Sequence, residues 1–170
     1  MGQRSKRMTG AVWTGLMALG LLDCSPQAGA EMAAKPESEA LATHPLSGLA
    51  IIPVTVTSGA KMHSFRTEVA ETPQQQAQGL MFRTELGPDE AMIFPREDDP
   101  SPARFWMKNT PIPLDIIFIG PDRRIANIAA MTVPYSLDGV ESAGDVIAVF
   151  EIAGGRAAQL GIAPGDKVDW

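Results

Sequence analysis

The chain has 170 residues, of which 45% are hydrophobic and 20% charged, and its formal net charge is −6 at pH 7. This length fits one domain with extensions, and the hydrophobic fraction is that of a globular protein, which excludes a wholly disordered chain. The excess of acidic residues disfavours binding to nucleic acid or anionic lipid, since both require clustered lysine and arginine.

Residues 1–30 have the pattern of an export signal. Three basic residues near the start precede an uncharged apolar run over residues 11–22, and Ala28-Gly29-Ala30 resembles a signal-peptidase cleavage site. The apolar run is too short to span a bilayer, which requires roughly 20 residues. The pattern predicts an exported protein, periplasmic or secreted.

Cys24 is the only cysteine, so no intramolecular disulfide can form. Its position just after the apolar run leaves three N-terminal arrangements open: cleavage after Ala30, a signal anchor, or lipidation at Cys24 as in a bacterial lipoprotein. Asp23 fits the lipoprotein pattern poorly because that position usually holds a small residue. Membrane attachment is expected only through the signal peptide or a lipid anchor.

A flexible tether is predicted for residues 31–48, which are rich in Ala, Glu, Ser and Pro and have no apolar period. A single globular domain is predicted for residues 49–170. Its first strand, over residues 51–56, contains Pro53 and is therefore expected at a sheet edge. The alternation over residues 65–69 predicts a half-buried strand.

A short helix is expected to begin at Thr72, the predicted N-cap of a capping box with Gln75, and to end at Gly79. A second short helix is predicted over residues 156–160. Further strands are predicted over residues 91–94, 103–107, 114–119, 124–129 and 145–152. These elements predict an α+β, mainly β fold, with a strongly bent mixed sheet closing toward a barrel or sandwich.

The most distinctive motif is Phe105-Trp106-Met107-Lys108-Asn109-Thr110-Pro111-Ile112-Pro113-Leu114-Asp115. With segments 79–83, 91–94, 149–155 and 160–168 in the same order, it resembles the bacterial and archaeal family known as domain of unknown function 192. The resemblance covers residues 65–169 and implies the fold and the export pattern, but no agreed activity. Ala91 departs from it, because the family usually has glycine there.

Most familiar catalytic and metal centres are disfavoured because residues 65–169 contain neither histidine nor cysteine. Cys–His and Ser–His–Asp arrangements and histidine-based zinc sites are therefore excluded from this region. Phosphate-binding glycine motifs are also missing. The sequence predicts no cofactor, no metal site and no assigned catalytic residue.

Five residues are candidates for a ligand site: Arg83, Trp106, Lys108, Asn109 and Asp115. Prolines stiffen the corner that carries most of them. Asp115 begins an apolar strand and needs a partner, for which Lys108 or Arg83 is available. The group is interpreted either as a ligand-binding constellation or as a structural ion pair with an Asn-capped turn.

Two side chains, one of them among these five candidates, have alternative positions. Trp106 either stacks a planar ligand or packs in the core. Glu151, inside Val149-Phe150-Glu151-Ile152, lies either at an outward rim position or inward, where it joins the same polar set.

Three functions are compatible with these features. The preferred one is a non-enzymatic, exported binding or accessory module of the cell envelope, whose partner is a small polar ligand or an envelope protein. The second is a hydrolase or lyase that uses Asp115 with Lys108, and the third is a structural envelope protein.

Overall fold

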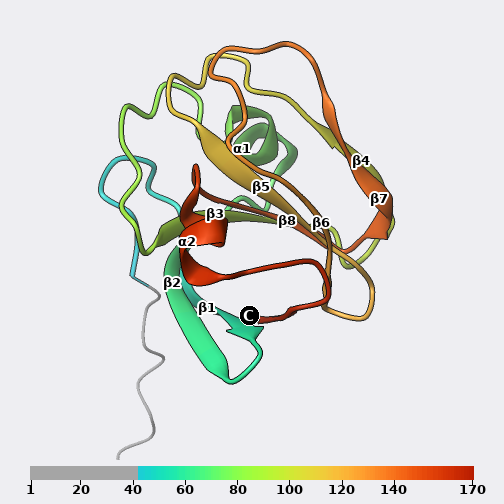
Figure 1. The fold of residues 1–170 in the computed structure, drawn as a ribbon. Helices are drawn as coiled ribbons and strands as arrows, with labels where there is room; N and C mark the ends of the chain where they lie inside the picture. Colours follow the sequence, from blue (N-terminus) through green and yellow to red (C-terminus); the bar gives the residue numbers. More distant parts are fainter. Residues whose placement is uncertain (1–41) are drawn as a thin grey trace, which may run out of the picture. The chain divides into compact units, whose positions relative to one another are not determined.

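The computed structural model describes residues 42–170 (Figure 1). Within that range, seven strands form one sheet in the order β6-β5-β8-β3-β2-β1-β9, and β4 pairs with β7 separately. The strands are β1 (Ile51–Ser58), β2 (Lys61–Val69), β3 (Glu90–Pro95), β4 (Ser101–Phe105), β5 (Leu114–Ile119), β6 (Ile125–Ala129), β7 (Val140–Val146), β8 (Ala148–Ala153) and β9 (Lys167–Asp169). Two short helices, α1 (Pro73–Gln78) and α2 (Arg156–Leu160), complete the predicted α+β, mainly β fold, which is confirmed.

The export signal, the lipidation of Cys24 and the first part of the tether, residues 31–41, lie outside the described residues. None of the helices within residues 42–170 has the length and apolar character needed to cross a membrane.

The large sheet is mixed and nearly closes on itself. Strands β2 and β3 run parallel, and the other neighbouring pairs are antiparallel. Its two end strands meet near Arg124 and Lys167, which form an isolated bridge. Beside the bridge, the Val168 amide donates to the Arg123 carbonyl at 2.9 Å. The predicted closure toward a barrel is therefore confirmed.

The central strands are buried on both faces, which explains their almost continuous apolar sequence. Along β8, Phe150 and Ile152 belong to one apolar cluster, together with Val54, Phe65 and Ile93. Val149 belongs to a second cluster on the opposite face, with Met92 and Ile116. Because side chains alternate along a strand, Glu151 faces the same side as Val149. The strand pairing thus directs a carboxyl group into the second cluster.

The predicted capping box of α1 is confirmed. The Thr72 hydroxyl accepts from the Gln75 amide at 3.2 Å, and the Gln75 side chain accepts from the Thr72 amide at 2.8 Å. Gly79 ends the helix with φ 47°, a conformation that favours glycine. The chain then crosses the second apolar cluster, into which it inserts Leu80.

The strand predicted over residues 145–152 is divided in two. The ladder breaks at Ile147, whose amide donates to the Ile119 carbonyl and whose carbonyl accepts from the Arg96 amide. Before the break β7 pairs with β4, and after it β8 pairs with β3 and β5. The apolar run continues through Ile147, so hydrophobicity alone does not reveal this change of sheet.

Two other boundaries differ from the expectations. Thr43 forms an isolated bridge with Ala50, so the folded part begins before residue 49 and includes the end of the predicted tether. Strand β1 is covered by β9 along Thr55, Val56 and Thr57, whereas Pro53 lies beyond this pairing. The strand is thus an edge only where proline removes the backbone donor.

Candidate functional site

The Phe105–Asp115 motif forms a corner between β4 and β5, and neighbouring loops hold this corner through backbone hydrogen bonds. Asn109 has φ 56°, and its carbonyl accepts from the Phe82 amide at 2.7 Å. The Thr110 carbonyl accepts from the Tyr135 amide at 3.1 Å, and the Met107 amide donates to the Ser136 carbonyl at 3.0 Å. The expected stiff corner is therefore present, but tertiary contacts support it as well as its prolines.

Asp115 anchors backbone rather than pairing with a cation. Its side chain is fully buried. One carboxylate oxygen accepts from the amides of Met131 at 2.8 Å and Gly155 at 2.9 Å, and the other accepts from the Ala157 amide at 2.8 Å. The prediction that Lys108 or Arg83 pairs with Asp115 is therefore wrong. Three backbone donors satisfy the carboxylate and fix the start of α2 against β5.

The same corner meets the glycine pair before α2. The Gly154 amide donates to the Pro113 carbonyl at 3.0 Å, and a Cβ atom on Gly154 would lie 2.9 Å from Pro113. The motif that ends at Asp115 and the glycine pair that ends at Gly155 therefore pack as one structural unit, although these two residues are 40 positions apart in the sequence.

Arg83 belongs to a separate buried network. Its guanidinium donates to the Glu68 carboxylate, with one N–O distance of 2.7 Å, and Ser47 donates to the same carboxylate. His44 lies 3.3 Å from the Arg83 guanidinium. The Arg83 side chain is 13% exposed and that of Glu68 is 4% exposed. This network joins residues near the start of the described chain to β2 and does not line the pocket of Trp106 and Lys108.

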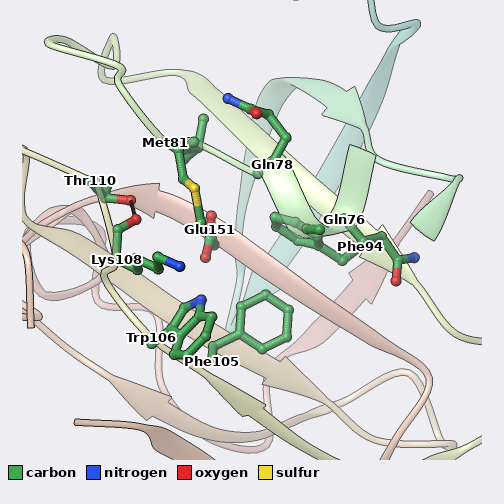
Figure 2. Close-up of a pocket in the computed structure, with 12 residues that line it drawn as sticks. Gln76, Gln78, Met81, Phe94, Phe105, Trp106, Lys108, Thr110 and Glu151 are labelled. Atoms are coloured by element: carbon green, nitrogen blue, oxygen red, sulfur yellow. Dashed lines mark hydrogen bonds between the residues drawn. The ribbon is translucent and has the colours of Figure 1, made fainter. Parts of the chain in front are cut away.

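A small pocket opens above the second apolar cluster, between the end of α1 and the 105–110 corner (Figure 2). Its volume is about 50 Å³, enough for a few water molecules or one small polar group. Three aromatic side chains, one methionine, several polar groups and three small or apolar residues of the α1 end line it: Phe94, Phe105, Trp106, Met81, Gln76, Gln78, Lys108, Thr110, Glu151, Ala77, Gly79 and Leu80.

Trp106 and Lys108 form the outer part of this pocket. Trp106 is 53% exposed, which excludes the core position considered for it. The Lys108 ammonium lies 5.4 Å from the centre of the Trp106 ring, within the range of a cation–π contact. Figure 2 shows the Lys108 ammonium and the indole nitrogen of Trp106 directed toward the carboxyl group of Glu151.

Glu151 forms the floor of the pocket. The residue is 5% exposed, and its neighbours across β3 and β5 are the buried Met92 and Ile116. The hydrogen bond drawn in Figure 2 joins the Thr110 hydroxyl to the Lys108 carbonyl, and none reaches Glu151. Burial raises the pKa of Glu151 from its ordinary 4.5 to about 8. At neutral pH this side chain is therefore a protonated acid, able to donate as well as accept.

Glu151 is the exception among the buried acidic residues of the described chain. The fold itself satisfies the other two, since Arg83 and Ser47 donate to Glu68 and three backbone amides donate to Asp115. Buried polar groups normally have partners inside the protein or from bound water. Glu151, which has no partner among residues 42–170 and faces a pocket, is therefore a functional-site candidate.

The structure brings together two of the five predicted site residues, Trp106 and Lys108. Asn109 supports the corner, with its side-chain amide 3.8 Å from the Met81 sulfur. Glu151 was not among the selected site residues, although the inward position considered for it is the one observed. The signal was an acidic residue inside a continuous apolar strand, which requires a special environment.

Comparisons with known proteins agree with this fold. A crystal structure of a protein of unknown function from Novosphingobium aromaticivorans is 60% identical, covers 79% of this chain and 95% of its own, and has a TM-score of 0.75. A crystal structure described as a putative transcription regulator from Sinorhizobium meliloti is 35% identical, covers 71% and 94% of the two chains, and has a TM-score of 0.68. A comparison with curated proteins finds no match. The family model DUF192, described as an uncharacterized ACR, matches residues 54–170. The chain belongs to the DUF192 family.

Proposed function

We propose that this protein is an exported, non-enzymatic binding module of the cell envelope, and that the pocket above Glu151 holds its small polar ligand. The observation that carries the proposal is the buried carboxyl group of Glu151, which lies at the floor of an open pocket and has no hydrogen-bond partner among residues 42–170. A hydrogen bond between a ligand and this group is stronger than the same bond on a solvated surface, because the site is already desolvated.

The alternative hydrolase or lyase has less support. It requires Asp115 and Lys108 to face one substrate, yet Asp115 is fully buried and both of its oxygens accept backbone hydrogen bonds. Asp115 does not line the pocket to which Lys108 contributes. An acid–base pair needs a free carboxylate within reach of the reacting atoms, and the Asp115 carboxylate is not free.

A ligand screen tests the binding proposal. Thermal unfolding of residues 42–170 is measured with sugars, amino acids, organic acids and amines, since a ligand that binds only the folded state raises the melting temperature. Glu151→Leu removes the polar floor and should abolish any such shift. The exposed Glu71 supplies the matched control, and Glu71→Gln should keep the shift. A library that stabilises neither the wild type nor the control would refute the small-molecule proposal.

The envelope location rests on residues 1–30 of the sequence. Mass spectrometry of the protein recovered after expression of residues 1–170 tests it: cleavage after Ala30 leaves a chain that begins at Glu31. An N-terminus at an acylated Cys24 would instead identify a lipoprotein, which is also located in the envelope. An uncleaved chain recovered from the cytoplasm would contradict export.

A further inference from the structure

We infer that the ligand of the Glu151 pocket is an organic monocarboxylate with an apolar tail, whose carboxylate accepts hydrogen bonds from Lys108, Trp106 and Glu151. This inference rests on the proposed binding function and names its ligand class. Three features of the pocket support it: the donors that face it, the charge they carry, and the apolar surface beside them.

The pocket presents donors and one positive charge. Lys108 carries three N–H donors and no acceptor, and the Trp106 indole carries one donor. Both are directed toward the pocket floor (Figure 2). Among the described residues that line the pocket, Lys108 and Glu151 are the titratable ones. The residues opposite Glu151 on the neighbouring strands are the uncharged Met92 of β3 and Ile116 of β5. With Glu151 protonated, the group has a net charge of +1 and complements an anion.

A cationic ligand fits this arrangement less well. Aromatic side chains beside a carboxyl group otherwise favour an ammonium ligand, but the Lys108 ammonium already lies 5.4 Å from the Trp106 ring centre. No salt bridge joins Lys108 to Glu151 within the described chain, where the ion pairs formed involve other residues. A second cation would be repelled by Lys108, whereas a carboxylate neutralises Lys108 and leaves Glu151 protonated.

The size of the pocket determines which part of the ligand enters. About 50 Å³ admits a carboxylate group and little more, so the rest of the molecule must lie outside. A second hollow of about 300 Å³ shares Phe105 and Trp106 with this pocket and is also lined by Arg104, Leu137 and Gly139. Leu137 is 67% exposed there. An apolar tail that crosses Trp106 and covers Leu137 removes apolar surface from water.

The test compares three probes with the same six-carbon chain: hexanoate, hexylamine and hexan-1-ol. Binding to the full chain is measured by titration calorimetry at about pH 6.5, where the acid is ionised and the amine is protonated. Hexanoate should bind and the other two should not. Lys108→Met should weaken hexanoate binding at least tenfold (about 1.4 kcal/mol), whereas Lys61→Met, on the distant and exposed β1–β2 turn, should leave it unchanged.

The pH profile gives a second readout. Hexanoate affinity should fall about tenfold per pH unit above pH 8, because ionised Glu151 repels the ligand, while Glu151→Gln should give a flat profile. Hexylamine binding that strengthens as the pH rises through 8 would overturn the carboxylate inference and still support a binding site. Failure of all three probes also overturns it, and the proposed function then fails only if the wider ligand screen is empty as well.

Discussion

Glu151 of β8 lies directly opposite Met92 of β3, and the Met92 side chain is 1% exposed. A carboxyl group in this position has lost most of its water without gaining a donor from the part of the chain that the structure describes. The free-energy cost of this desolvation falls on the ionised form of Glu151. The pKa of the side chain is therefore raised well above its ordinary value. This pairing makes the stability of the domain depend on pH.

The pH dependence is tested with Glu151→Gln. The raised pKa, about 8 against 4.5, means that the folded state keeps a proton that the unfolded chain releases. The resulting stability is fully present below pH 4.5 and is lost as the pH rises through 8, a change on the order of 5 kcal/mol. Urea unfolding should therefore show wild type losing stability between pH 5 and pH 8.5 relative to the variant. Parallel profiles for the two proteins would contradict this, and Glu71→Gln serves as the exposed control.

Asp115→Asn should destabilise the domain by about 2–4 kcal/mol, since an amide NH₂ group would face backbone donors and leave them buried without an acceptor. Hydrogen exchange should increase at Ala157, whose amide donates to Asp115 at 2.8 Å. Chemical denaturation gives the energy and exchange gives the location. The exposed control Asp138→Asn should lie within about 0.5 kcal/mol of wild type, and an equally small effect at Asp115 would mean that α2 does not depend on this anchor.

Arg83→Met should lower the free energy of unfolding by about 3–5 kcal/mol, because it leaves the Glu68 carboxylate buried without a positive charge beside it. Adding Glu68→Leu removes that carboxylate and should recover more than half of the loss. A double-mutant cycle in urea measures the coupling. The exposed pair Arg104–Glu141, with both side chains 66% exposed, is the control, and its coupling should stay below about 1 kcal/mol. Similar couplings for the two pairs would contradict the prediction that burial makes the Arg83–Glu68 pair the stronger one.

Lys108→Met should change the free energy of unfolding by less than about 1 kcal/mol, since the residue is exposed and its described contact is the Trp106 ring. A structural ion pair with Asp115 predicts a loss several times larger. Thermal and urea unfolding distinguish the two, with Arg83→Met as the positive control for a broken buried pair. A large loss of stability at Lys108 would place it in the framework rather than at the ligand.

The parts of the fold that depend on neighbouring residues were predictable from sequence. The capping box of Thr72 and Gln75 is complete within four residues, so the motif contains all that the interaction requires. The strands predicted over residues 91–94 and 114–119 are likewise present, as part of β3 and as β5. The break at Ile147 was missed because it depends on hydrogen bonds to Ile119 and Arg96, which no local pattern reveals.

The candidate site was only partly predictable for the same reason. Trp106 and Lys108 share one motif, and the structure keeps them in one pocket. The partners of Asp115 are backbone amides as far away as Ala157, 42 residues along the chain. Glu68 occupied the polar phase of an alternating strand, yet Arg83 and the segment around Ser47 cover it.

By itself, the sequence determined the family, the mainly β fold and the need of Asp115 for a partner, since composition, strand period and motif order are local properties. Only the tertiary structure decided which of the buried acids receive hydrogen bonds from the rest of the described chain. Asp115 and Glu68 receive donors from distant segments, whereas Glu151 lies between apolar neighbours beneath an open pocket. That difference arises from strand pairing and loop packing, and it separates the structural carboxylates from the one available to a ligand.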